Sequence, residues 1–146
     1  MKEIEAMAIL TGDPELLDAI DDRISAVGDY IEELDLKMPD GSEPREGWLP
    51  AVFLPDADMD RYSVNCSDNT IITDKDDMAE YGLPEDLAAA LILNVDGPKE
   101  DIMNMFADIA GKFGLDAIVE TAVRRYPITP NGTAAADPMD LLRDYP

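Results

Sequence analysis

The sequence predicts a mixed α+β domain, and three observations lead to that prediction. Residues 3–10 alternate in polarity as a β-strand does, whereas residues 13–35 repeat apolar side chains at helical spacing. Residues 61–73 contain two short β-like runs separated by a polar turn at 67–69. From residue 74 onward the pattern becomes helical. The expected order is an N-terminal strand, a long amphipathic helix, a small antiparallel hairpin or sheet, and a helical C-terminal half.

The N-terminal strand is predicted from the positions of four apolar side chains. Ile4, Ala6, Ala8 and Leu10 occupy alternate positions in residues 3–10, which is the period of a β-strand. We therefore expect a strand with one better-buried face.

Segment 13–35 is predicted to be one long helix. Asp13 is a favourable N-cap, and Pro14 suits the first helical position because a backbone N–H there has no helical partner. Apolar side chains then recur at intervals of three and four, which places them along one stripe. These positions are Leu17, Ile20, Ile24, Val27, Ile31 and Leu34. Such a stripe requires an apolar surface to pack against.

A row of carboxylates is predicted on the opposite side of this helix. At about 100° per residue, five acidic positions fall together. They are Glu15, Asp18, Asp22, Asp29 and Glu33, with Asp21 and Glu32 flanking them. Like charges three or four residues apart destabilise a helix by roughly 0.2–0.5 kcal/mol per pair. The row is therefore either the solvated face of a very acidic protein or a surface that presents negative charge to a basic partner.

The middle of the chain is predicted to contain a loop and short strands. Residues 36–50 are rich in proline and glycine, and Trp48 is expected to anchor this loop on the core. A short strand is expected at 51–54, followed by the hairpin at 61–73. Cys66 has no basic neighbour in the sequence, so we expect a small buried residue and not a nucleophile.

Four helical segments are predicted in the C-terminal half. A short acidic helix begins at Asp74, and Gly114 and Pro127 are natural stops for the third and fourth segments. The four segments are 74–82, 83–94, 98–114 and 115–126.

A second arrangement competes with the helical C-terminal half. Residues 6–14 and 90–98 both combine an apolar run, a Gly/Asp turn and a proline, and each precedes an amphipathic helix. This similarity suggests two β-α units, as in a ferredoxin-like split β-α-β fold with an insertion. Residues 88–95 and 117–126 are then strands of one sheet with 3–10. The period of short apolar runs does not decide between the two arrangements.

The length of 146 residues suits one domain with a substantial core. We expect a single compact acidic α+β domain over 1–126. Residues 127–146 form a Pro/Gly/Ala-rich tail, with one helical turn near 139–142.

Charge and composition exclude several classes of function. The chain has 33 acidic and 11 basic residues, a net charge of −22, which repels nucleic acid and anionic lipid and attracts basic proteins. The longest apolar run, 87–93, is too short to cross a membrane, and the acidic N-terminus does not resemble a signal peptide. A single cysteine fits a reducing cytoplasm. Because histidine is absent, we expect a protein that is not an enzyme and has no cofactor.

Two further acidic groups are candidate sites. Carboxylates alternate at Asp56, Asp58 and Asp60 as at the start of a calcium loop, but Arg61 and Ser67 stand where such a loop needs glycine and glutamate. These three residues are weak metal candidates. A second group is formed by Asp74, Asp76 and Asp77, which we assign to the partner-binding surface.

The leading hypothesis is an inhibitor that imitates the charge of DNA. From Glu15 to Glu33 a helix rises about 27 Å, a length over which one DNA strand carries about eight phosphates. We therefore expect a monomer or homodimer, encoded by a phage or mobile element, of anti-CRISPR or anti-restriction type. Its partner is expected to be a basic nuclease or CRISPR effector subunit.

Three other hypotheses remain open from the sequence. An immunity protein or antitoxin against a basic nuclease toxin has the same charge. A protein of a high-salt organism also has an acidic surface, although twelve isoleucines and eight methionines are untypical of one. The third hypothesis is a calcium-responsive protein, and it rests on calcium binding by the carboxylates of residues 56–60.

Overall fold

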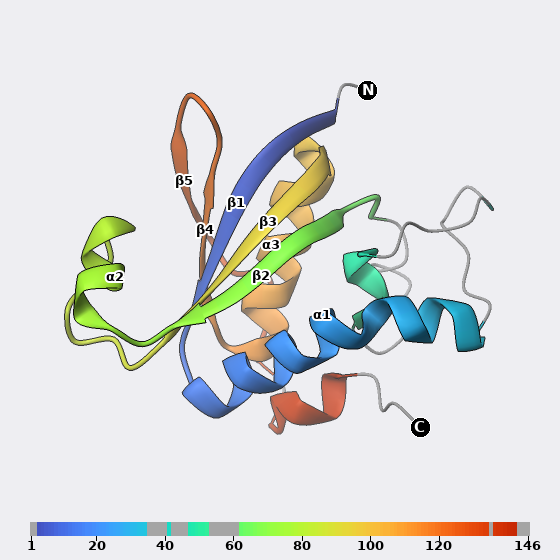
Figure 1. Ribbon diagram of the computed structural model, residues 1–146, viewed down its shortest axis with the longest axis horizontal. Helices are drawn as coiled ribbons and strands as arrows, with labels where there is room; N and C mark the ends of the chain where they lie inside the picture. Colours follow the sequence, from blue (N-terminus) through green and yellow to red (C-terminus); the bar gives the residue numbers. More distant parts are fainter. Residues whose placement is uncertain (1–2, 35–40, 42–46, 53–61, 135, 143–146) are drawn as a thin grey trace.

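The computed structural model describes residues 3–34, 41, 47–52, 62–134 and 136–142, with side chains for all of these except 28–34 and 51. Within these residues, five strands form one antiparallel sheet in the order β2-β3-β1-β4-β5 (Figure 1). The strands are β1 (Glu3–Thr11), β2 (Asn65–Ile72), β3 (Ala90–Pro98), β4 (Asp116–Glu120) and β5 (Arg125–Ile128).

Three α-helices and two short 3₁₀ helices accompany the sheet in the described part of the chain. The elements are α1 (Pro14–Leu34), η1 (Leu49–Val52), α2 (Lys75–Glu80), α3 (Lys99–Phe113) and η2 (Pro138–Leu141). The fold is thus mixed α+β, with the N-terminal strand followed directly by the long helix (Figure 1).

The prediction of a helical C-terminal half is wrong. The strand order agrees with the alternative prediction, the split β-α-β arrangement. β1 lies between β3 and β4, so that each of the two strands followed by a long helix is central in the sheet. The order β2-β3-β1-β4 is that of a split β-α-β sandwich, with β5 added at one edge. Segments 83–94 and 115–126, both expected to be helical, contain instead the start of β3, all of β4 and the start of β5.

The error in β3 has a physical cause. Leu91 and Leu93 pack on one face of the sheet and Ala90 and Ile92 on the other, and all four are at most 4% exposed. A strand covered on both faces loses the alternation of polarity that identifies strands in a sequence. Its continuous apolar run was therefore indistinguishable from a buried helix.

The turn between β4 and β5 is held by a threonine that the helical interpretation overlooked. The Thr121 backbone N–H donates to the Arg124 carbonyl over 2.8 Å. The Thr121 hydroxyl oxygen accepts from the backbone N–H groups of Val123 and Arg124 over 3.4 and 3.2 Å. These bonds close a hairpin in place of a helix.

The hairpin expected at 61–73 is also wrong, because β2 runs straight through the polar residues at its centre. The pairing of β2 with β3 shifts between Cys66 and Asp68, so Ser67 is the extra residue of a β-bulge. β2 is an edge strand, and polar side chains are compatible with such a position. Of the short strand expected at 51–54, the described residues belong to η1 and the rest lie outside the described residues.

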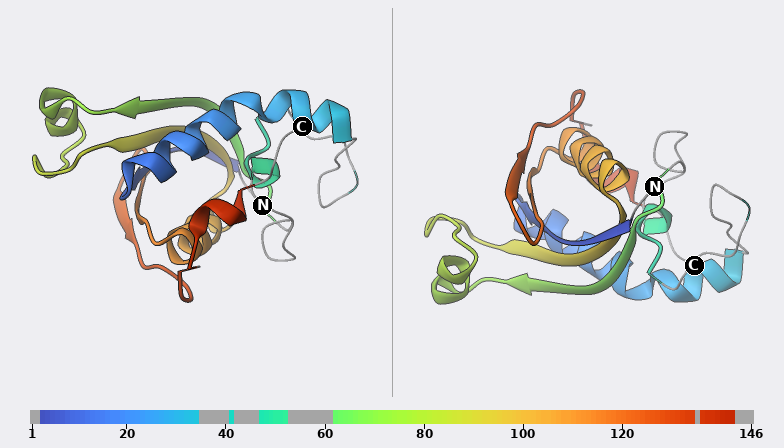
Figure 2. Two further views of the ribbon diagram at one scale, coloured as in Figure 1. Left: turned by 90° about the horizontal axis from the view of Figure 1, so that it is seen from below. Right: turned by 90° about the horizontal axis from the view of Figure 1, so that it is seen from above.

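The main core lies between the sheet and the two long helices, which cover the same face (Figure 2). α1 contributes its apolar stripe, including Leu17, Ile20 and Ile24, and α3 contributes residues such as Phe106. Trp48 is 5% exposed in this core, as expected for an anchor of its loop, and its indole N–H donates to the Tyr62 carbonyl over 3.4 Å.

A smaller core lies on the opposite face of the sheet, beneath α2. It contains Ile9, Ile72 and Ile92 from the strands, together with Met78 of α2 and Leu83. α2 and the segment after it therefore cover one part of the second face. The other part of that face carries no helix among the described residues (Figure 1).

The two confirmed helices of the C-terminal half have the expected ends. Asp74 caps α2, since its side chain accepts from the Asp76 backbone N–H over 2.9 Å. α3 ends at Gly114, which has the left-handed conformation that glycine adopts without a steric penalty.

The segment after β5 packs against α3. The Asn131 backbone N–H donates to the Ala107 carbonyl over 3.0 Å, and Leu142 is 3% exposed within the main core. A Cβ atom at Gly111 would overlap the Asn131 carbonyl oxygen. Gly111 therefore allows this segment to lie directly on the helix.

We predict that Gly111→Ala lowers the free energy of unfolding by about 1–3 kcal/mol, because the added methyl group overpacks the contact with Asn131. Helix propensity alone predicts the opposite sign, since alanine is favoured over glycine by about 1 kcal/mol. Urea unfolding measures the difference. Asn104→Ala, at an exposed position of the same helix, is the control, and helix propensity predicts that it raises stability by at most about 0.7 kcal/mol. An equally stable or more stable Gly111→Ala variant would contradict the contact.

Candidate functional site

The outer face of α1 is the first candidate surface. Glu15, Asp18 and Asp22 are exposed, whereas Leu17 and Ile20, which point the opposite way, are fully buried. The packing of the apolar stripe on the sheet therefore forces the carboxylate row outward. The helical backbone continues to Leu34, so Asp29, Glu32 and Glu33 lie on the same helix, but their side chains are outside the described residues.

Arg23 is the one basic residue of this helix, and it does not interrupt the row. It is half-buried and, at about 100° per residue, projects about 100° away from Asp22. The row of exposed carboxylates is therefore continuous over the described part of the face.

Asp21, which is predicted to contact the partner, forms a hydrogen bond within the fold. Its carboxylate accepts a hydrogen bond from the Asn69 side-chain amide over 2.6 Å, and the same amide donates to the Ser25 hydroxyl oxygen over 3.0 Å. Asn69 thus ties α1 to the edge strand β2. The sequence did not suggest this contact, because Asn69 was assigned to a turn.

The acidic group on α2 lies on the other side of the sheet. Asp76 and Asp77 are exposed, whereas Asp74 caps the helix. Because the buried Met78 of α2 packs in the smaller core, α2 and α1 belong to opposite faces of the sheet. The two acidic groups therefore do not form one continuous row.

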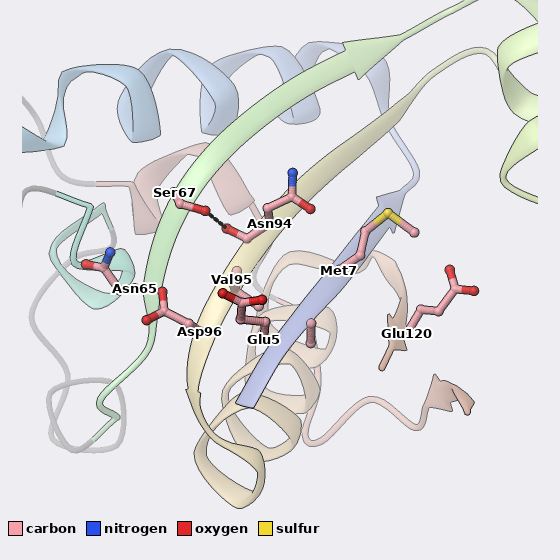
Figure 3. A pocket seen from close by; sticks show the side chains of 9 residues that line it. Glu5, Met7, Asn65, Ser67, Asn94, Val95, Asp96 and Glu120 are labelled. Carbon is pink, nitrogen blue, oxygen red and sulfur yellow. Dashed lines mark hydrogen bonds between the residues drawn. The ribbon is translucent and has the colours of Figure 1, made fainter. Parts of the chain in front are cut away.

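A third candidate is a hollow of about 650 Å³ on the part of the second face that α2 leaves uncovered (Figure 3). Among the described residues, its lining contains three carboxylates and no basic side chain. The lining residues are Glu5, Ala6, Met7, Asn65, Ser67, Asn94, Val95, Asp96 and Glu120.

Strand pairing places these three carboxylates around Met7. Glu5 is directly opposite Asp96, and Met7 is directly opposite both Asn94 and Glu120. Opposite residues project to the same face, with Cβ atoms about 4.5–5.5 Å apart. Figure 3 shows the Glu5 and Asp96 carboxylates side by side, with Met7 between them and Glu120.

The sequence interpretation missed this site because it did not predict β4 and placed 83–94 in a helix. Under the two-unit alternative, the alternation of β1 and β4 would have placed Glu5 and Glu120 on one face. The available signal was Glu3, Glu5 and Met7 on the less apolar face of the first strand.

Two basic side chains lie near the β5 edge of the sheet, on the ring of Tyr126. The Lys99 ammonium donates to the Tyr126 hydroxyl over 2.9 Å and lies 4.6 Å from the centre of its ring, and the Arg124 guanidinium lies 5.8 Å from the same ring. The hydrogen bond from Lys99 lowers the pKa of Tyr126. Tyr126 belongs to the edge strand β5, whereas α1 packs mainly over β2 and β3.

Cys66 is a buried thiol, as the sequence predicted. Burial raises the pKa of the Cys66 thiol to about 12, and its S–H donates to the Asp68 carbonyl over 3.2 Å. A thiol that stays protonated near neutral pH is a poor nucleophile.

In the part of the chain that the structure describes, no three acidic or thiol side chains are grouped closely enough to hold a metal ion. The weak metal candidates Asp56, Asp58 and Asp60 lie outside the described residues. No described helix is both long and apolar enough to cross a membrane.

Comparison with protein-family models, with curated proteins and with solved structures finds no match.

We predict that Cys66 makes the protein less stable at high pH. The unfolded thiol ionises near its ordinary pKa of 9.0, whereas the folded thiol stays protonated up to about pH 12. The contribution is therefore complete below pH 9 and is lost as pH rises from 9 to 12. Between pH 8 and pH 10.5 the free energy of unfolding should fall by about 1–2 kcal/mol more in the wild type than in Cys66→Ala.

Urea unfolding at the two pH values tests this difference, and the variant subtracts the titration of lysine and tyrosine side chains. An equal fall in both proteins would show that Cys66 does not stay protonated in the folded state.

Proposed function

We propose that this chain is a non-enzymatic inhibitor that binds a basic, nucleic-acid-handling protein by presenting the charge of DNA along α1. The observation that carries the proposal is the exposed row Glu15, Asp18 and Asp22, opposite a fully buried apolar stripe. A phage or mobile-element inhibitor of anti-restriction or anti-CRISPR type has this character. The partner is then a nuclease or a CRISPR effector subunit.

The charge density of the described row supports the comparison with DNA. From Glu15 to Asp22 the helix rises about 10 Å, and one DNA strand carries about three phosphates over that length. Three exposed carboxylates occupy the same span. The helical backbone continues for about three more turns beyond Asp22, through the positions of Asp29 and Glu33.

The row is held on a rigid element, which favours binding. Leu17, Ile20 and Ile24 anchor α1 in the core, and the bond between Asp21 and Asn69 ties it to β2. A preorganised charged surface loses less conformational entropy on binding than a flexible acidic tail does.

The distribution of positive charge supports the same proposal. Lys99 and Arg124 are held on the ring of Tyr126 at the β5 edge, whereas α1 packs over β2 and β3. Lys99 and Arg124 therefore lie away from the surface that a basic partner of α1 would approach. Steering by such a field increases the association rate and weakens with salt.

The composition argues against catalysis by this chain. Histidine is absent from the sequence, and the one cysteine is buried with a raised pKa. A reducing cytoplasm, where nucleic-acid-handling targets work, is compatible with a free thiol.

We predict that the double reversal Asp18→Lys and Asp22→Lys weakens partner binding at least about tenfold, because both side chains project from α1 into solvent. Affinity capture from a lysate of the source organism, with mass spectrometry, identifies the partner that the wild type retains. Duplex DNA should release that partner from this chain, because the proposal has DNA and α1 compete for the same basic groove of the partner. Rising salt should release it steeply.

Glu80→Lys with Glu85→Lys is the matched control. It changes the net charge equally, at exposed positions in and after α2, and should leave capture unchanged. Circular dichroism establishes that both variants are folded. If both double variants lose the partner equally, or if neither does, the α1 row is not the binding surface. Capture of a toxin that is not displaced by DNA would instead indicate an immunity protein.

A further inference from the structure

We infer that the hollow on the uncovered sheet face binds an arginine side chain projecting from a basic segment of a protein partner. This inference does not depend on the α1 proposal, because the hollow and α1 lie on opposite faces of the sheet.

The hollow combines negative charge with an apolar floor. Met7 is half-buried and packs against the smaller core. Ile9, the next residue of β1 on the same face of the sheet, is fully buried in that core. Glu5, Asp96 and Glu120 stand around Met7 on three adjacent strands (Figure 3). A long side chain with an apolar stem and a cationic head matches both features.

The spacing of the carboxylates favours an extended cation over a metal ion. Glu5 and Asp96 are opposite neighbours, and Glu120 is diagonal to Glu5, about 7–8 Å away by sheet geometry. Within the described residues these carboxylates do not form a group that could hold a metal. A planar guanidinium presents five N–H donors and can bond two neighbouring carboxylates at once.

The polar residues of the hollow suit the same ligand. Asn94 and Ser67 line it beside the carboxylates, and the Ser67 hydroxyl already donates to the Asn94 carbonyl over 3.3 Å. Side-chain oxygens at this rim can accept the remaining guanidinium N–H groups.

The basic side chain paired with Glu120 does not fill the hollow. Arg125 is opposite Glu120 on β5, but it does not line the hollow. Its guanidinium lies beside Gly82, where one nitrogen is 2.9 Å from the position of a Cβ atom. Neither Lys99 nor Arg124 lines the hollow.

The test is an NMR titration of the full ¹⁵N-labelled chain with the blocked peptide acetyl-Gly-Arg-Gly-Arg-Gly-amide. We expect saturable shifts at the amides of Glu5, Met7, Asn94 and Glu120. The same peptide with citrulline in place of arginine keeps the shape without the charge, and it should not bind. Magnesium chloride at the same ionic strength should not reproduce the shifts.

The variant Glu5→Gln with Glu120→Gln should raise the Kd for the arginine peptide about tenfold or more, because both amides are uncharged isosteres. The matched control, Glu80→Gln with Glu85→Gln, removes the same charge at exposed positions in and after α2 and should leave the Kd unchanged. Three outcomes would overturn the inference: saturable shifts at the amides of α1 and not at those of the hollow, an equal loss of affinity for the peptide in both variants, or no saturable binding. None of these outcomes bears on capture by α1, which the Lys reversals test separately.

Discussion

The structure depends on the burial of its two central strands between apolar layers. β1 and β3 pair along their whole lengths. Ile9 is fully buried on one face of the sheet, and Leu10 and Leu91 are fully buried on the other. A net charge of −22 opposes compaction through self-repulsion, so an apolar core of this kind is needed to hold the chain together. Covering the first face with α1 and α3 leaves the carboxylates no position except the outside.

The same burial explains which elements could be predicted from the sequence. α1 and α3 are covered on one side only, so their apolar stripes keep the helical period and both were predicted. β1 keeps its polar residues at Glu3 and Glu5, and its alternation survived in the sequence. β3 is covered on both faces over residues 90–93, and its apolar run there has no period to read. β2 was divided in two because its bulge and edge position allow polar residues in the middle of a strand.

The candidate surfaces differ in predictability for a related reason. The α1 row is local in the sequence, so helical period alone shows that Asp18 and Asp22 share a face. The hollow is assembled from β1, β3 and β4, and Glu5 and Glu120 are neighbours only through the pairing of those strands. Without the pairing, no spacing in the sequence joins them. The contact between Asp21 and Asn69 could not be predicted for the same reason, because it joins α1 to a strand 48 positions further along the chain.

The two surfaces also differ in what they can recognise. The α1 row is exposed to solvent, where charges act over about a Debye length of 8–10 Å and discriminate little between basic ligands. The hollow adds Met7 as a floor and fixed carboxylates from neighbouring strands, so a ligand there must match in shape as well as charge. Because the surfaces face opposite ways, a partner held by both would need a globular basic groove and a separate basic segment. The two proposals therefore predict separable roles, with attraction of a basic partner by α1 and selection of an arginine side chain by the hollow.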